Sequence, residues 1–222
     1  MRTRLNAAWY PDFPDQWDGR AFRERVLAAI TPQTRMLDIG AGRGATEIMP
    51  FKGLVAELIG MDVDPAGLQN TDVDRAVHTP DGSLRGVEDA SCDVVVSKHV
   101  LEHVEDPSQF FGEVARVLKP GGVFLAVTPN ATHYVPLIAR LPPLSFHKAF
   151  NKLRGRATVD TFPTHYRANS ASVLNPGWRR PGWRWSRSSV TKAGRSICAC
   201  IRCSTSAACS TSARSTDLDS MR

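Results

Sequence analysis

The chain has 222 residues and a net charge of +6, which is enough for one α/β domain but too short for a two-domain dehydrogenase of ordinary size. No run of about 18 apolar residues occurs, and the N-terminal stretch is broken by Pro, Asp and Trp, so we expect a soluble, cytoplasmic protein without a transmembrane segment. Residues 171–222 hold nine Lys and Arg against two Asp and Glu, whereas residues 1–170 hold 19 against 20, so the charge of the main body gives no reason to expect nucleic acid as a partner.

The first predicted element is a helix from Arg20 to Ile30. Phe22, Val26 and Ile30 recur at the spacing of one helical face, and Pro32 follows the last of them. We expect this helix to pack on a sheet through its apolar face.

Five short apolar runs follow, bounded by glycine, proline or polar residues, as is typical of buried parallel strands. They alternate with candidate helices, the first of which covers residues 45–52. This order predicts an α/β fold with a doubly wound, mostly parallel sheet. The predicted strands lie at residues 35–39, 54–64, 75–79, 92–97 and 121–130.

A stronger helix signal lies between the fourth and fifth of these runs. Asp106 starts it with the sequence Asp-Pro-Ser, and a Lys-Pro-Gly-Gly turn ends it at Gly122. Five apolar side chains between these points fall on one helical face, which we expect to be buried. They are Phe110, Phe111, Val114, Val117 and Leu118.

The alternation of strands and helices stops after Pro129. Residues 131–160 mix apolar and basic side chains with several prolines. We interpret them as an insert beside the sheet, either a lid that faces the substrate or a surface helix pair without a special role. Residues 1–170 are assigned to one domain that contains this insert, and residues 171–222 to a basic tail.

A glycine-rich turn follows the first predicted strand. Gly40, Gly42 and Gly44 stand at the carboxyl end of that strand, where doubly wound sheets bind ligands and where glycine lets the backbone approach them closely. Asp62 ends the second strand, and a carboxylate there can accept both ribose hydroxyl hydrogens. Because Ala45 completes the fingerprint G-x-G-x-x-A, these residues predict an adenosine cofactor without choosing between a nicotinamide and another one.

Further segments, taken together with the turn, distinguish between these cofactors. LDIGAGRG, GMDVDP and CDVVVSKHVLEHVEDPSQFFGEVARVLKPGGVFLAVTPN occur in order over residues 35–130. Together they resemble the bacterial type 11-like group of class I S-adenosylmethionine-dependent methyltransferases. The resemblance implies a Rossmann-like methyltransferase fold, methyltransferase activity and S-adenosyl-L-methionine as the cofactor of the domain at residues 1–170.

The resemblance also implies a set of cofactor contacts. The methionine and ribose side would be lined by Asp38, Gly40, Ala41, Gly42 and Gly44, and the ribose hydroxyls would be bound by Asp62. The adenine side would be formed by Val63 and by Asp81 with Gly82 or Ser83. The pocket near the sulfonium would be closed by Ser97, Lys98 and His103.

Candidate catalytic residues follow the fourth predicted strand, and candidate acceptor contacts flank the insert. A base is needed only if the nucleophile arrives protonated, and His99 or His103 would suit that role near pH 7. The alternative is that His103 caps or packs a helix. His133, Tyr166 and Arg167 flank the insert and are predicted to contact the acceptor, or else to form a polar edge that holds the insert.

Residues 171–222 depart from the family pattern. The family would continue with an amphipathic helix and two strands, and this Ser-, Arg- and Cys-rich stretch shows no such period. We therefore predict a tail of low order, with the C-terminal strands missing or replaced and a sheet edge exposed. A shifted reading frame would explain the change in composition. The spacing Cys198-x-Cys200-x-x-Cys203 lacks the second pair of a structural zinc site, so no metal is predicted.

The sequence thus favours methyl transfer from S-adenosylmethionine to a small-molecule acceptor or to one linked to a lipid or sugar. Two alternatives stay open at this point. One is a catalytically impaired protein of the same fold that still holds the cofactor, and the other is an NAD(P)-dependent reductase.

Overall fold

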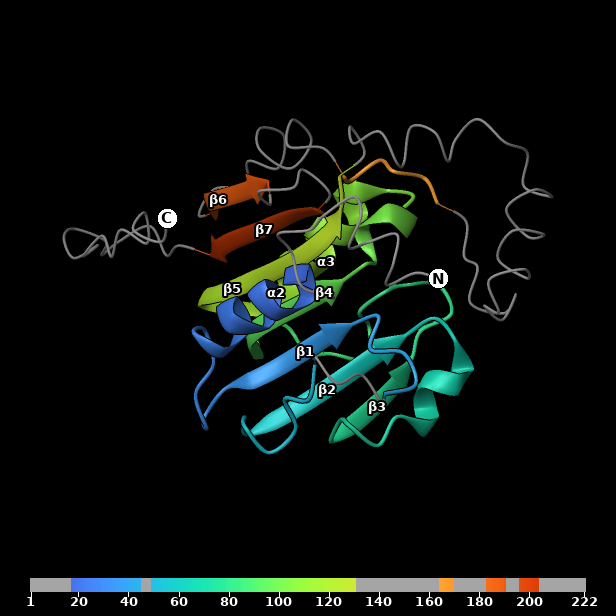
Figure 1. The fold of residues 1–222 in the computed structure, drawn as a ribbon. Helices are drawn as coiled ribbons and strands as arrows, with labels where there is room; N and C mark the ends of the chain where they lie inside the picture. The colour runs from blue at the N-terminus through green and yellow to red at the C-terminus, as the bar shows by residue number, and fades with distance from the viewer. Residues whose placement is uncertain (1–16, 45–48, 131–163, 170–182, 191–195, 204–222) are drawn as a thin grey trace, which may run out of the picture.

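The computed structural model describes residues 17–44, 49–130, 164–169, 183–190 and 196–203. They form one seven-stranded sheet with the strand order β3-β2-β1-β4-β5-β7-β6 (Figure 1). Strands β1 to β5 pair in parallel, whereas β7 is antiparallel to β5, and β6 to β7. The predicted α/β fold with a mostly parallel sheet is confirmed. The strands are β1 (Arg35–Ile39), β2 (Glu57–Asp62), β3 (Arg75–His78), β4 (Cys92–Lys98), β5 (Leu118–Pro129), β6 (Trp183–Val190) and β7 (Ser196–Cys203).

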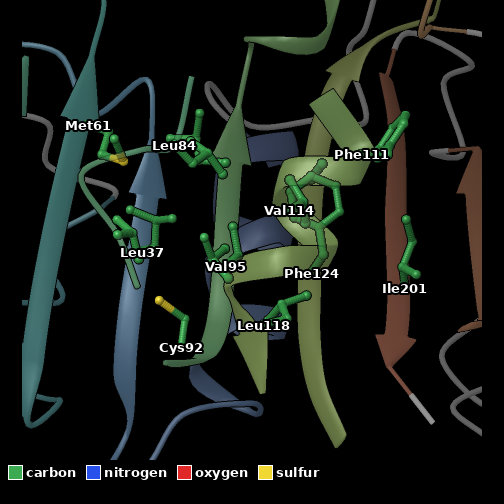
Figure 2. Close-up of a cluster of buried hydrophobic side chains, with 14 of the residues drawn as sticks. Leu37, Met61, Leu84, Cys92, Val95, Phe111, Val114, Leu118, Phe124 and Ile201 are labelled. Atoms are coloured by element: carbon green, nitrogen blue, oxygen red, sulfur yellow. The ribbon is translucent and has the colours of Figure 1, made fainter. Parts of the chain in front are cut away.

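Helices cover both faces of the sheet, which is why its central strands are apolar on both sides. Helix α2 (Trp17–Leu27) buries Phe22 and Val26 against one face. Helix α3 (Pro107–Val117) covers the other face, where Val114 is fully buried and Phe111 meets Phe124 edge to face at 6.1 Å between ring centroids (Figure 2). Both helices had been expected from their apolar periodicity, and both are present.

Helix α3 begins where its start signal predicts. The Asp106 carboxylate accepts hydrogen bonds from the backbone N–H groups of Ser108 and Gln109, at 2.8 and 3.2 Å, and Pro107 occupies the first turn. This cap satisfies two N–H groups that have no partner within the helix.

The Lys-Pro-Gly-Gly turn lies within β5 and does not precede it, so the strand starts at Leu118, three residues earlier than predicted. The register between β4 and β5 shifts between Cys92 and Val94, which accommodates the extra residues as an irregularity in the ladder. Gly121 has a φ of +85°, a conformation that glycine adopts without strain.

One predicted helix is not supported. Residues 49–52 of the helix expected at 45–52 are not helical, and residues 45–48 lie outside the described part of the chain. Pro50 explains the difference, because a proline removes a helical hydrogen bond and disfavours helical geometry in the residue before it.

The prediction that the tail contributes no strands is wrong at β6 and β7, which extend the sheet beyond β5. Ala199 and Ile201 are buried at 2% and 1% exposure and alternate along β7. This alternation is difficult to recognise in the sequence, because cysteines, serines and arginines surround the two apolar residues. The hydrogen bonds to the edge of β5 also stabilise the strand, and the composition of the tail does not indicate them. The rest of the tail and the insert at 131–160 lie outside the described residues.

Two short 3-10 helices complete the described chain, η1 (Pro65–Gln69) after β2 and η2 (Leu101–His103) after β4. Both follow carboxyl ends of strands, on the side of the sheet where doubly wound folds bind ligands. Within the described ranges, no helix combines the length and apolarity required to cross a membrane.

Candidate cofactor and acceptor site

The turn after β1 depends on glycine at its first position. The N–H groups of Gly40 and Ala41 both donate to the Met61 carbonyl, at 2.8 and 3.1 Å, which draws the turn onto the end of β2. Gly40 has a φ of +76°, and a Cβ there would lie 2.3 Å from Cγ2 of Val100. Only glycine fits this position.

Gly42 is different, because its surroundings are open. Its φ is +61°, yet a Cβ there would meet no described atom within 4 Å. Close packing therefore does not explain the glycine at this position, and the space next to its Cα is open. This is the space in which a ligand could approach the backbone closely.

Asp62 joins this turn to the next one. Its Oδ2 accepts the Gly42 N–H at 2.7 Å, and its Oδ1 accepts the Asp64 N–H at 2.8 Å. Each carboxylate oxygen keeps a second lone pair, so Asp62 can also accept hydrogen bonds from the two hydroxyls of a ribose. The structure thus brings the two strongest sequence signals, Gly42 and Asp62, into direct contact.

Asn70 also holds the turn and was not predicted. Its amide Nδ2 donates to the carbonyls of Ala41 and Gly42, at 3.2 and 3.1 Å, and its Oδ1 accepts the Asp72 N–H at 2.8 Å. The side chain is buried, at 8% exposure. Nothing in the sequence signals this role, because Asn70 lies in a loop 28 residues beyond Gly42 and belongs to no motif.

Asp38 places a second carboxyl group on β1 beside this turn. Burial raises the pKa of Asp38 to about 7, and the nearby Asp62 charge acts in the same direction, whereas Lys98 opposes it. The three residues come from β1, β2 and β4, so their interaction confirms that the carboxyl ends of these strands converge. At neutral pH, Asp38 is poised to ionise when a cation comes close.

The residues predicted for the adenine side also lie together. Val63 is an exposed apolar side chain, at 41%, just beyond β2. A Cβ on Gly82 would lie 4.0 Å from Cγ1 of Val63, so the loop after β3 approaches it. Asp81 Oδ1 accepts the Ser83 N–H at 3.0 Å and closes this loop, while Nε2 of His78 lies 3.1 Å from the Val63 carbonyl oxygen.

The residues after β4 differ strongly in exposure. Ser97 is fully buried, and its hydroxyl has no hydrogen-bond partner among the described residues. His99 has a side chain that is 43% exposed and a φ of +58°, a conformation that residues other than glycine adopt rarely. His103 lies at the end of η2 and is half-buried. His99 is thus the more accessible of the two predicted bases.

A buried carboxylate that the sequence analysis had not singled out lies at the same place. Glu102 is 6% exposed, and its Oε2 accepts a hydrogen bond of 3.0 Å from the Thr128 hydroxyl at the end of β5. Thr128 in turn accepts a hydrogen bond from the Asn169 amide. The sequence hides this chain of contacts, because its members lie 26 and 41 residues apart.

The segment at 164–169 reaches this site through two backbone N–H groups and the Arg167 side chain. The N–H groups of His165 and Tyr166 donate to the Glu102 carbonyl, at 2.7 and 3.1 Å, and Arg167 donates to the Glu105 carbonyl at 3.0 Å. Two of the predicted acceptor contacts, Tyr166 and Arg167, therefore lie beside η2. The third, His133, lies outside the described residues.

Comparison with known proteins finds a methyltransferase domain within the chain. A methyltransferase domain family model matches residues 37–126, which contain the turn, Asp62 and α3. Over these residues the chain is similar to class I S-adenosylmethionine-dependent methyltransferases. The chain is 39% identical over 119 residues to a protein of Mycolicibacterium smegmatis named as a probable S-adenosylmethionine-dependent methyltransferase, covering 50% of this chain and 44% of that protein.

Two further similarities concern a second curated protein and a solved structure. The chain is 34% identical over 110 residues to a ubiquinone biosynthesis O-methyltransferase of Maricaulis maris, covering 44% of this chain and 41% of that protein. The fold matches an S-adenosylmethionine-dependent methyltransferase from Mesorhizobium loti with a TM-score of 0.60 at 18% identity, covering 86% of this chain and 99% of that one. This chain thus spans less than half the length of the first curated relatives it matches.

The described residues fit S-adenosylmethionine chemically. The cofactor carries a sulfonium and an ammonium cation beside an adenosine. Asp38 and Asp62 place two carboxyl groups next to the turn, where Gly42 adjoins open space. Val63 offers an exposed apolar side chain just beyond β2. The positive charges, the ribose hydroxyls and the adenine ring each have a complementary partner at this edge of the sheet.

Proposed function

We propose that this protein transfers a methyl group from S-adenosylmethionine to a small-molecule acceptor, or to one linked to a lipid or sugar. The observation that carries the proposal is the hydrogen bond from Gly42 N to Asp62 Oδ2, at 2.7 Å, within the residues that match a methyltransferase domain family. This bond joins the carboxylate that we propose to bind the ribose directly to the glycine turn.

The chain's own residues have mainly a positioning task. When bound, the cofactor supplies a methyl group already activated on sulfur. Asp62 and Val63 would hold the adenosine, and Asp38 would hold the methionine end. Such alignment of reacting groups can supply on the order of 7 to 11 kcal/mol of the barrier.

The acceptor is proposed to present a hydroxyl group. His99, exposed at the end of β4, can take up the proton that leaves the oxygen as it is methylated. Tyr166 and Arg167 lie close enough, through their bonds to the loop after β4, to form the acceptor wall. The O-methyltransferase of Maricaulis maris among the relatives supports oxygen as the acceptor atom.

Calorimetry tests the cofactor. We expect S-adenosylhomocysteine to bind the full chain with micromolar affinity or better, and NADH to show no saturable binding. Tight binding of NADH alone would support the reductase alternative and overturn the proposal.

Methyl transfer is tested separately. The protein is incubated with S-adenosylmethionine labelled in the methyl group and a bacterial metabolite extract, and labelled products are separated by chromatography. A labelled product that depends on the protein supports the proposal. Binding of S-adenosylhomocysteine without any labelled product would support the impaired cofactor-binding alternative.

A further inference from the structure

Glu102 is a buried carboxylate on which several contacts converge. It lies in η2, and its carboxylate is 8% exposed, although Asp and Glu are rarely so buried unless they are paired. Oε2 accepts the Thr128 hydroxyl at 3.0 Å, and Oε1 lies 3.7 Å from Nδ1 of His99. Its backbone carbonyl also accepts two N–H groups from the segment at 164–169.

The hydrogen bonds on the Thr128 side run in one direction. The Asn169 amide donates to Thr128 Oγ1 and, at 3.3 Å, to the Pro129 carbonyl. Thr128 donates onward to Glu102. Because the donor that reaches Pro129 has to be an N–H, the orientation of the Asn169 amide is fixed, and the relay ends on the carboxylate. Asn169 is fully buried, so this relay is shielded from water.

Backbone strain is found on both sides of Glu102. Only three residues other than glycine have a positive φ among those described, and two of them contact Glu102: His99, with φ +58°, and Tyr166, with φ +52°. Each such conformation costs on the order of 1 kcal/mol or more and persists only where surrounding contacts enforce it. Strain of this kind is concentrated at functional sites.

We propose that Glu102 is a positioning residue, which holds Nδ1 of His99 so that Nε2 faces the acceptor, and which anchors the segment at 164–169 as the acceptor wall. This rests on the methyl transfer proposed above. A carboxylate beside Nδ1 favours the tautomer with the proton on that nitrogen, leaving the lone pair on Nε2. The separation of 3.7 Å exceeds hydrogen-bond length, and catalytic contacts of this kind often tighten when substrate binds.

Methylation of a hydroxyl group releases one proton, and in this arrangement His99 accepts it. The acceptor oxygen forms a bond to the methyl carbon as the bond from that carbon to sulfur breaks. The hydroxyl proton passes to Nε2 of His99, and the resulting imidazolium is stabilised by Glu102. Among the charged or titratable groups near His99 are Glu102, which faces it, and Lys98, which precedes it in the chain. His103 follows Glu102 in η2, and His165 and Tyr166 donate to the Glu102 carbonyl.

The first test needs no acceptor. The full chain is labelled with ¹⁵N-histidine, and the ring nitrogens are observed by NMR at a pH where His99 is neutral, with the His99→Gln variant assigning the signal. We expect the Nδ1–H tautomer in the wild-type protein and a shift toward Nε2–H in Glu102→Gln. Glu105→Gln, which makes the same change at an exposed side chain three residues further on, serves as the matched control and leaves the tautomer unchanged.

The second test uses the labelled-methyl assay on the same proteins. Glu102→Gln is expected to lower the transfer rate about 10- to 100-fold, while the affinity for S-adenosylhomocysteine changes less than about twofold. Thr128→Val, which removes only the relay hydroxyl, is expected to raise the acceptor KM more than it lowers kcat. Glu105→Gln retains the wild-type rate.

The outcomes separate this inference from the proposed function. A wild-type His99 in the Nε2–H tautomer, or one that Glu102→Gln does not alter, overturns the inference even if methyl transfer is observed. Conversely, a tautomer that depends on Glu102 in a protein without transferase activity would support the pairing of the two residues and contradict the proposed function.

Discussion

The N–H of Gly42 donates a hydrogen bond of 2.7 Å to Oδ2 of Asp62 and so ties the glycine turn after β1 to the end of β2. The two residues lie 20 positions apart and come from neighbouring parallel strands. Their contact fixes the distance between the part of the site that would hold the methionine and ribose and the part that would hold the adenine.

Replacing Asp62 by Asn is expected to weaken S-adenosylhomocysteine binding about 10- to 100-fold. The amide keeps one acceptor oxygen for Gly42 but loses the charge and the second acceptor, and hydrogen bonds to charged groups contribute about 1.5 to 3 kcal/mol. Calorimetry measures the affinity, and Asp89→Asn at the exposed far side of the domain is the matched control. Equal affinities for the two variants would exclude Asp62 from the cofactor site.

Alanine at Gly40 and at Gly42 is expected to have different effects. Both positions have a positive φ, which costs an alanine roughly 1 to 2 kcal/mol. Only at Gly40 would the new methyl also collide with Val100, so we expect a larger loss of unfolding free energy there. Gly42→Ala fills open space instead and is expected to reduce cofactor affinity. Urea unfolding and calorimetry measure the two effects, and a Gly42→Ala variant with full affinity would contradict this assignment.

Asp38 makes stability depend on pH in a defined direction. Its pKa is raised from 3.8 to about 7, so the folded protein binds more protons than the unfolded chain between about pH 4 and pH 7. The contribution of Asp38 therefore becomes less favourable as the pH rises through this range and is flat above it. Urea unfolding across the range is expected to show this slope, and Asp38→Asn to reduce it. A variant with an undiminished slope would argue against the raised pKa.

The same group couples cofactor binding to proton release. If Asp38 contacts a cation of the cofactor, binding favours the carboxylate, so protons are released near pH 6.5. Calorimetry with S-adenosylhomocysteine in buffers of different ionisation enthalpy measures this release. It is expected to disappear in Asp38→Asn, and a wild-type protein that releases no protons would place the cation elsewhere.

Strand β7 can be tested through its buried face. Ile201 is 1% exposed and packs in the same cluster as Phe124 (Figure 2), so Ile201→Ala is expected to cost about 2 to 5 kcal/mol of unfolding free energy. Leu68→Ala, at a side chain that is 55% exposed, is expected to cost less than about 0.5 kcal/mol. Similar small losses in both variants would mean that β7 does not complete the sheet.

How much the sequence predicts depends on the range of the interactions involved. Phe111, Val114 and Val117 repeat within one helix, so local periodicity was enough to predict α3 and its buried face. Strands β1 to β5 were also predicted from a local signal, because each contains a short apolar run. Strand β7 was missed because its stability comes from pairing with β5, far away in the chain, and not from its own composition.

The site follows the same rule. Gly42 and Asp62 each carry a motif, so their roles could be inferred before their contact was seen. Asn70 belongs to no motif, and the motif that contains Glu102 does not indicate its contacts. The importance of both residues lies in hydrogen bonds to residues that only the fold brings close. Sequence patterns therefore indicate residues that are proposed to face the ligand, whereas the residues that hold them in place are recognised only in the fold.

The labelled-methyl assay, run side by side on the wild-type protein and Asp62→Asn, tests the central claim most directly. We expect a labelled product in a metabolite extract with the wild-type protein, and a rate at least about tenfold lower for Asp62→Asn at low cofactor concentration. A wild-type protein that binds S-adenosylhomocysteine but labels no acceptor, or a variant as active as wild type, would contradict it.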